Sequence, residues 1–315
     1  MRIAIIGSGG IGGLYGLRLA AAGADVRFVA RGAHLAAMRE HGLAVESDAY
    51  GEARLDKPNV VETPQAVAAQ GTVDLVLISV KLWDTAALLP MLEPLIGPDT
   101  AVLSLQNGVL KDDDLRTACG PEHVIGGVAY VATHIKSPGV ISQNGPMQKF
   151  IIGEYGGARS ARIETLNDLA LKAGLQSAIS ADIERTLWEK FVFLVGLSAT
   201  TALLRQPMGA IRRNPVTRAF LHDIMRETVA VGRARGVSLP VDYADERLAF
   251  ADTVPATMAA SMSHDLARGN RLELDWLSGA VVTLGMRHQV PTPMNRAVVA
   301  GLELHKNGQS GPSHA

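Results

Sequence analysis

Six residues near the amino terminus have the types and spacing of a phosphate-binding loop. Gly7-Ser8-Gly9-Gly10-Ile11-Gly12 matches the pattern G-x-G-x-x-G and directly follows the apolar run Ile3-Ala4-Ile5-Ile6. In such loops the first glycine permits a tight turn, the second lets the backbone approach a pyrophosphate, and the third allows a helix to pack closely on a strand. A glycine loop with only a structural role is the alternative. The position between a predicted strand and a predicted helix favours dinucleotide binding.

The end of the second predicted strand indicates which dinucleotide is bound. NAD-binding loops usually have an acid about 20 residues after the glycines, where it holds the ribose hydroxyls. This chain has Phe28-Val29-Ala30-Arg31 there, and a guanidinium can hold a 2'-phosphate through two parallel hydrogen bonds. A solvated loop arginine is the alternative. NADP(H) is therefore predicted in preference to NAD(H).

A lysine in an apolar setting is the candidate for acid catalysis. Lys190 follows Trp188-Glu189 and precedes Phe191-Val192-Phe193. Burial disfavours a charged ammonium, so a lysine here could give up and regain a proton near neutral pH. Two alternatives stay open. The side chain could extend from a buried helix towards water, or its charge could hold a developing alkoxide without transferring a proton.

Two further polar residues follow predicted strands. Lys81 comes after the apolar run 75–80, and Asn107 comes after the run 101–105. Open α/β sheets bind their ligands at the carboxyl ends of the strands, so both side chains are candidate ligand contacts. Taken alone, Lys81 could be an ordinary charge at a strand end, and Asn107-Gly108 an ordinary turn.

The elements that position these residues alternate regularly up to about residue 179. Short apolar runs are followed by amphipathic stretches, which predicts βαβ units with a parallel sheet. Strands are expected at 3–6, 26–30, 75–80, 101–105 and 124–133, and helices at 11–22, 33–40, 84–92 and 160–173. A hairpin of 139–142 and 150–153, joined across Asn144-Gly145-Pro146, is expected at the sheet edge.

After residue 180 the strand signals disappear and helical periods replace them. Helices are expected at 183–204, 215–235, 244–251, 256–287 and 293–306. The fold class is therefore α/β, with a mostly parallel Rossmann-type domain over 1–180 and an all-α second domain over 181–306. Residues 307–315, rich in Gly and Ser, are expected to form a flexible tail.

Composition narrows the class of protein. The 315 residues have a net charge of -1, 47% hydrophobic and 19% charged residues, so no strong field would attract nucleic acid. No apolar stretch is long enough to cross a membrane, and one cysteine, Cys119, cannot form an internal disulfide. The nine histidines show no metal-ligand spacing. We expect a cytoplasmic protein without a metal. A homodimer is possible because the helices after Pro255 are apolar, but buried helices of a monomer would look the same.

The chain resembles the ketopantoate reductase (2-dehydropantoate 2-reductase) family from Met1 to about Ala300. The matching segments occur in the family's order: 7–12, Arg31, 80–83, 106–109, 188–190, 261–262 and 273–275. The resemblance implies that NADPH reduces a small 2-oxo acid such as ketopantoate and that Lys190 protonates its C2 oxygen. It implies substrate contacts at Asn107 and Ser261, and cofactor contacts at Gly7, Ser8, Gly9, Gly10, Ile11, Gly12, Arg31, Lys81, Asn107, Ala132 and Glu273.

The chain departs from the family pattern on the helix of Lys190. Leu194 and Ser198, four and eight residues further on, share its face, where family members have asparagines; the family often has a third near Met208. Ser198 is the remaining polar candidate for substrate contact. An unpaired polar group costs about 1 to 3 kcal/mol, which favours a more apolar 2-oxo acid. The alternatives are a non-catalytic NADP-binding module and a related dehydrogenase acting on another hydroxy acid.

Overall fold

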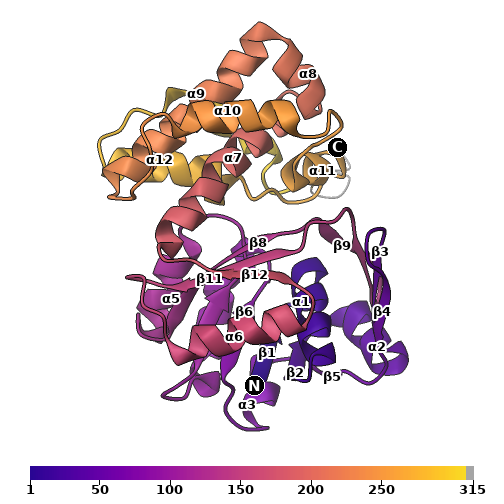
Figure 1. Ribbon diagram of the computed structural model, residues 1–315. Helices are drawn as coiled ribbons and strands as arrows, with labels where there is room; N and C mark the ends of the chain where they lie inside the picture. Colours follow the sequence, from indigo (N-terminus) through magenta and orange to yellow (C-terminus); the bar gives the residue numbers. More distant parts are fainter. Residues whose placement is uncertain (310–315) are drawn as a thin grey trace, which may run out of the picture. The chain divides into compact units, whose positions relative to one another are not determined.

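The computed structural model of the protein describes residues 1–309, and the chain forms two compact units. Unit 1 comprises Met1–Gln106 and Lys111–Ile183, and unit 2 comprises Asn107–Leu110 and the residues from Glu184 onward. The predicted fold class is confirmed: a sheet with helices, coloured indigo to pink, is followed by a helical region, coloured rose to yellow (Figure 1). The short segment 107–110 follows a strand of unit 1 but packs within unit 2.

An eight-stranded sheet forms the centre of unit 1, in the order β12-β11-β8-β7-β6-β1-β2-β5. Every neighbouring pair is parallel except β8 with β11. The strands are β1 (Arg2–Ile6), β2 (Asp25–Val29), β5 (Asn59–Val61), β6 (Leu75–Ile78), β7 (Ala101–Ser104), β8 (Val124–Tyr130), β11 (Lys149–Glu154) and β12 (Gln176–Ile179).

Helices cover both faces of this sheet, so its central strands are buried on both sides. Alternate residues enter different cores: Ile5 and Leu77 belong to one cluster, and Ala4 and Val76 to the other. Burial on both faces explains why these strands are continuous apolar runs in the sequence. The helices are α1 (Gly10–Ala21), α2 (Gly32–His41), α3 (Pro64–Ala68), η1 (Leu82–Asp84), α4 (Thr85–Leu88), η2 (Leu89–Met91), η3 (Glu93–Leu95), α5 (Lys111–Cys119) and α6 (Ala161–Lys172).

A second, four-stranded sheet in unit 1 shows that the predicted hairpin is wrong. Its order is β4 (Gly51–Leu55), β3 (Leu43–Ser47), β10 (Val140–Gln143) and β9 (Thr133–Ser137). β10 pairs with β9 and β3, whereas β11 pairs with β8 and β12. The predicted turn therefore joins strands of two different sheets. The predicted strand 124–133 is likewise two elements, β8 and the first residue of β9.

Unit 2 is helical. The prediction of one long helix over 256–287 is wrong. That stretch contains two helices and a 3-10 turn, because Gly269 adopts a left-handed φ of +69° and ends the first helix. The elements are α7 (Ile183–Leu203), α8 (Met208–Arg213), α9 (Pro215–Ala234), α10 (Tyr243–Thr253), α11 (Ser261–Ala267), η4 (Leu274–Trp276), α12 (Ser278–Arg287), α13 (Pro293–Leu302) and η5 (Glu303–His305).

The core of unit 2 depends on close contact between α7 and α9. An added Cβ at Gly196 of α7 would lie 2.7 Å from the Cγ of Met225, and one at Gly232 of α9 would lie 2.6 Å from the ring of Trp188. Each helix thus has a glycine where the other's large side chain packs. Alanine at either position would force these helices apart.

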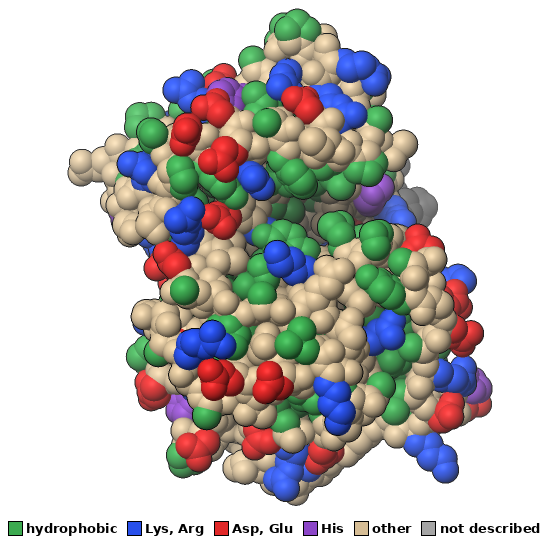
Figure 2. Space-filling view, in the orientation of Figure 1, with side chains coloured by type: hydrophobic (Ala, Val, Ile, Leu, Met, Phe, Trp, Pro, Cys, Tyr) green, Lys and Arg blue, Asp and Glu red, His purple; other side chains and the backbone are tan. Residues whose placement is uncertain are grey.

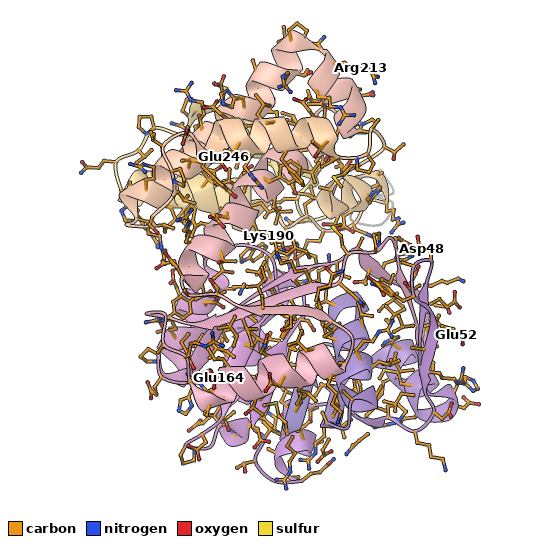
Figure 3. The ribbon with its side chains drawn as sticks, viewed as in Figure 1. Asp48, Glu52, Glu164, Lys190, Arg213 and Glu246 are labelled. Carbon is orange, nitrogen blue, oxygen red and sulfur yellow. The ribbon has the colours of Figure 1, made fainter. Side chains whose placement is uncertain are left out.

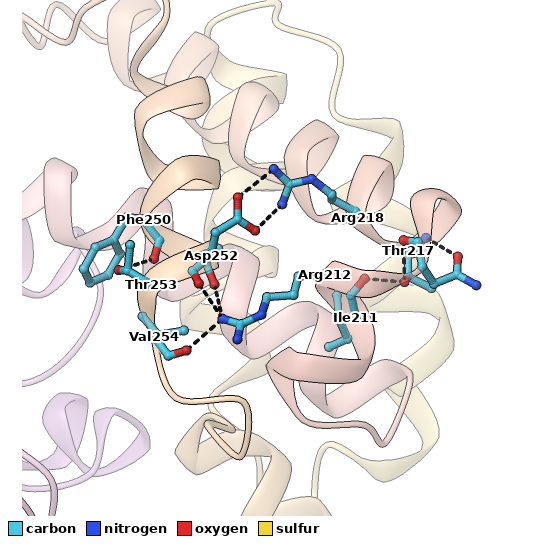
Figure 4. Close-up of polar contacts among 10 residues, drawn as sticks. Ile211, Arg212, Thr217, Arg218, Phe250, Asp252, Thr253 and Val254 are labelled. Carbon is cyan, nitrogen blue, oxygen red and sulfur yellow. Dashed lines mark hydrogen bonds and ion pairs between the residues drawn. The ribbon is translucent and has the colours of Figure 1, made fainter.

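The carboxyl end of α10 is fixed by two arginines from α8 and α9 (Figure 4). Arg212 donates to the carbonyl oxygens of Ala251, Asp252 and Val254 at 2.9, 3.0 and 2.7 Å. Arg218 donates to both carboxylate oxygens of Asp252 at 2.7 and 2.9 Å. A helix end leaves its last carbonyl groups unpaired, and these contacts satisfy several of them.

The surface and the end of the chain carry two further observations. Basic and acidic side chains are intermingled on the face drawn in Figure 2, and within residues 1–309 no helix is long and apolar enough to span a membrane.

Of the predicted tail, 310–315 lie outside the described residues. Gly308 and Gln309 donate backbone hydrogen bonds to His305 and Gly269.

Candidate active site

The glycine loop has the geometry that its sequence predicts. Gly7 adopts a φ of +94°, which only glycine readily takes, and turns the chain sharply after β1. A Cβ on Gly12 would lie 2.2 Å from the carbonyl oxygen of Gly7, so no side chain fits between helix and strand. A Cβ on Gly9 would meet nothing within 4 Å. The loop is therefore tight at both ends and open in the middle, where a pyrophosphate would approach the backbone.

The loop is anchored to the neighbouring strand and leads into a helix with a positive end. The backbone N–H of Ser8 and its hydroxyl both donate to the carbonyl of Val29, at 3.1 and 3.0 Å. The side chain of Ser8 therefore fixes the loop to β2. The first turn of α1 contains no acidic residue that would neutralise the helix dipole. This arrangement fits an anionic pyrophosphate at the amino end of α1.

Lys81 and Arg31 lie on either side of this loop at the carboxyl edge of the sheet. Lys81 follows β6 and Arg31 follows β2, and the sheet order β6-β1-β2 puts the glycine loop between them. Both side chains are exposed. The Lys81 ammonium lies 5.3 Å from the centre of the Trp83 ring. Arg31 forms no ion pair with an acidic side chain within residues 1–309. The guanidinium is thus available for a 2'-phosphate.

Ala132 lies in the segment that packs over the loop. It is exposed, and its carbonyl accepts a hydrogen bond of 2.9 Å from the N–H of Asn144. Its neighbour Thr133 contacts the loop directly, since a Cβ on Gly10 would lie 2.8 Å from the Thr133 hydroxyl oxygen. Thr133 could not be recognised from the sequence, because no local pattern places β9 against the loop.

Lys190 and Asn107 are paired within unit 2. The Lys190 ammonium donates to the side-chain oxygen of Asn107 at 3.0 Å, and both side chains are half-buried. Figure 3 shows Lys190 in the first half of α7. Its neighbours Trp188 and Phe191 are buried, with ring centres 5.5 Å apart in an edge-to-face contact. The predicted acid therefore extends from an apolar helix and is held by a neutral amide.

The Asn107 segment packs beside the turn that begins after Glu273. Gly108 has a φ of +88°, and a Cβ on it would lie 3.2 Å from the carbonyl oxygen of Trp276 in η4. Glu273 directly precedes η4 and is half-buried. Unit 2 thus places Lys190, Asn107 and the turn after Glu273 next to one another, although they are distant in the sequence.

The two serines predicted to bind substrate differ in exposure. Ser261 is exposed at the start of α11, where the preceding Ala260 N–H donates to the Thr201 hydroxyl at 3.3 Å. Thr201 is eleven residues beyond Lys190, or about 16 Å along α7. Ser198 is only 1% exposed, and its hydroxyl has no hydrogen-bond partner among the described residues. Contact of either serine with substrate remains a prediction.

A Rossmann-type unit with a G-x-G-x-x-G loop, followed by a helical unit with an amine–amide pair, is typical of nicotinamide-dependent oxidoreductases. Residues 3–157 match the family described as ketopantoate reductase PanE/ApbA, and 182–306 match its C-terminal family. A 2-dehydropantoate 2-reductase of Mesorhizobium japonicum is 34% identical, over 95% of this chain and 96% of that protein.

Solved structures give the same result. The 2-dehydropantoate 2-reductase of Geobacter metallireducens is 31% identical with a TM-score of 0.88, covering 96% of this chain and 99% of that one. A PanE/ApbA family ketopantoate reductase of Ralstonia eutropha is 34% identical with a TM-score of 0.87, covering 97% and 98%. The chain belongs to the ketopantoate reductase family. It is an NADP-dependent oxidoreductase, and the cofactor of this family is NADPH.

Proposed function

We propose that this protein reduces a small 2-oxo acid to the 2-hydroxy acid with NADPH, and that Lys190 is the general acid. The observation that carries the proposal is the 3.0 Å hydrogen bond from the Lys190 ammonium to the Asn107 side-chain oxygen. Two residues 83 positions apart, both implied by the family resemblance to act on substrate, meet in the folded chain.

The chemistry needs a cation at the oxygen of the carbonyl group. When bound, NADPH supplies the hydride that reduces the carbonyl carbon. Negative charge then develops on the oxygen, where the ammonium of Lys190 stabilises it and donates a proton. Asn107 holds the ammonium by accepting one of its hydrogen bonds, which restricts the rotation of a long, flexible side chain. Lys190 lies between the buried residues Trp188 and Phe191 of α7, so the backbone that carries its side chain is held by packing.

The substrate proposed here is less polar than ketopantoate at one end. Leu194, one helical turn after Lys190, is half-buried and supplies no hydrogen-bonding group. Ser198, a further turn along, is buried. A terminal hydroxyl like that of ketopantoate would lose its partners against this face, at a cost of about 1 to 3 kcal/mol. A 2-oxo acid with an aliphatic group in that position avoids the loss.

Replacing Lys190 tests the proposed role. Lys190→Ala should lower kcat by about 10² to 10⁴ fold, the usual contribution of general acid catalysis. NADPH affinity should stay within about threefold, because the glycine loop and Arg31 are unchanged. Lys190→Arg should not restore the rate, since a guanidinium is too weak an acid to release a proton near neutral pH. Stopped-flow measurement of NADPH oxidation in a single turnover would follow the chemical step directly.

Lys172→Ala is the matched control, because Lys172 is exposed at the end of α6. Its rate should equal that of the unmodified protein. Near-normal turnover of Lys190→Ala would remove Lys190 from the mechanism. If the unmodified protein bound NADPH but none of the 2-oxo acids led to its oxidation, the alternative of a non-catalytic NADP-binding module would stand instead.

A further inference from the structure

His34 connects two segments of unit 1 that are far apart in the sequence. It lies in the first turn of α2, three residues after Arg31, and is half-buried. Its Nε2 lies 2.8 Å from the carbonyl oxygen of Ser8 in the glycine loop. Its Nδ1 lies 3.0 Å from the backbone nitrogen of Gly139, which precedes β10. The imidazole ring thus joins the loop to the turn between β9 and β10.

The two contacts determine where the imidazole proton lies. Gly139 can only donate through its N–H, so Nδ1 of His34 must accept and carries no proton. The single proton of the neutral ring is therefore on Nε2, from which it is donated to the Ser8 carbonyl. Partial burial of the ring lowers the pKa of His34, and the hydrogen bond to Ser8 opposes this shift without cancelling it. The neutral form is accordingly favoured.

The contact with Ser8 fixes the direction of a peptide group in the cofactor loop. No cis peptide bond occurs within residues 1–309, and in a trans peptide the C=O and the following N–H point in opposite directions. A Ser8 carbonyl that points to His34 therefore aims the Gly9 N–H away from α2. The N–H groups of this loop are the donors that a pyrophosphate needs.

We propose that His34 is a positioning residue for the dinucleotide, acting on the direction of the Ser8–Gly9 peptide. The hydrogen bonds from Ser8 to Val29 hold the loop through the N–H and hydroxyl of Ser8, but the peptide that follows can still rotate about ψ of Ser8. His34 restrains that rotation. Because His34 belongs to α2, the same contact also holds the start of this helix, which follows Arg31, against the glycine loop. The proposal rests on NADP(H) binding and not on the substrate.

The two hydrogen bonds of His34 can be separated by substitution. The amide of glutamine reaches about as far as Nε2, so His34→Gln can still donate to the Ser8 carbonyl. The amide of asparagine lies at about the position of Nδ1, so His34→Asn can accept from Gly139 but does not reach Ser8. If the Ser8 contact positions the loop, these variants should differ in NADPH affinity although both lose one contact.

We expect His34→Asn to raise the Kd for NADPH about tenfold, which corresponds to about 1.4 kcal/mol and to the usual contribution of one hydrogen bond. His34→Gln should stay within about threefold of the unmodified protein. Isothermal titration with NADPH in the absence of substrate gives these values and does not depend on the proposed reaction. At saturating NADPH, kcat of both variants should remain within about twofold.

Controls separate positioning from a general loss of structure. His288→Asn, at an exposed histidine after α12, should leave the Kd unchanged. An equal loss of NADPH affinity in His34→Asn and His34→Gln would reduce His34 to a structural link, and an unchanged Kd in both would also overturn the proposal. Nitrogen-15 NMR of the unmodified, ligand-free protein should show His34 protonated at Nε2 alone; a proton on Nδ1 would contradict the geometry directly.

Discussion

At the scale of single residues, we propose that different side chains serve cofactor binding and chemistry. Gly7 and Gly12 lie where the loop leaves no room for a side chain, and Arg31 is a candidate contact for the 2'-phosphate. Lys190 and Asn107 form a polar pair with a different task, which we propose to be charge stabilisation at the substrate oxygen. Substitutions in the first group should therefore change cofactor affinity, and substitution of Lys190 should change the rate.

Arg31→Ala should remove most of the preference for NADPH over NADH. A guanidinium bound to a phosphate contributes about 1.5 to 3 kcal/mol, so NADPH affinity should fall roughly tenfold to a hundredfold, whereas NADH affinity should change little. Quenching of tryptophan fluorescence during titration with each cofactor measures both values. Arg39→Ala, at an exposed arginine of α2, the helix that follows Arg31, is the control. Equal affinity of the unmodified protein for the two cofactors would refute the role of Arg31.

At the scale of elements, local patterns predicted the strands that are buried on both faces of the sheet. They failed for strands whose pairing partners lie far away in the sequence. The runs that form β1, β6 and β7 are apolar throughout, so their strand character is visible in a few residues. The small sheet was missed because Gly51–Leu55 is polar and mostly exposed, and β9 is also exposed. β10 was assigned to the wrong partner because the sequence cannot show that β3, almost a hundred residues earlier, lies beside it.

The helix prediction failed at 256–287 for a different reason. Apolar residues continue with helical spacing on both sides of Gly269-Asn270, and periodicity alone does not show whether a glycine ends a helix. The structure decides this through the left-handed φ of Gly269. The two candidate residues are therefore not on one helix: Ser261 begins α11, and Glu273 directly precedes η4.

The junction of β11 and α6 supports a prediction about pH. Glu154 accepts a hydrogen bond from the Ser160 hydroxyl. It also accepts two from the Arg162 guanidinium, one at each carboxylate oxygen and both at 2.7 Å. Burial raises the pKa of Glu154, but the hydrogen bonds from Arg162 and Ser160 and the charge of Arg162 together outweigh burial, so the pKa lies below its usual value of 4.5. The folded state thus holds this proton less tightly than the unfolded state. The resulting stabilisation is present above about pH 4.5 and is lost as the pH falls through the folded-state pKa.

Glu154→Gln should accordingly lower the free energy of unfolding at pH 7 by about 1 to 3 kcal/mol, because it removes charged hydrogen bonds to Arg162. The difference from the unmodified protein should shrink as the pH is lowered towards 3. Thermal unfolding followed by circular dichroism at several pH values measures it. Glu164→Gln, which removes an exposed partner of Arg159, should have little effect. A stability difference that did not depend on pH would contradict this account of Glu154.

At the scale of the whole molecule, the change from alternating strands and helices to helical periods predicted two regions. The sequence did not predict that the loop after β7 packs in the second unit. Asn107–Leu110 follows a strand of unit 1 and packs in unit 2, where Val109 is part of the buried core. Nothing local in Asn107-Gly108 distinguishes such a segment from an ordinary turn. The assignment of Asn107 as a partner of Lys190 therefore needed the tertiary structure, whereas the glycine loop could be recognised from six residues.

The most direct test of the central claim is steady-state oxidation of NADPH by the unmodified protein with paired 2-oxo acids. One member of the pair is ketopantoate, and the other is the same acid without its terminal hydroxyl. We predict stoichiometric formation of 2-hydroxy acid from both. The kcat/KM should be about tenfold or more higher for the acid without the hydroxyl, because Leu194 offers that group no hydrogen-bond partner. A strong preference for ketopantoate would contradict the proposed substrate class. Tight NADPH binding without oxidation by either acid, or by any other small 2-oxo acid, would contradict the proposed reaction itself.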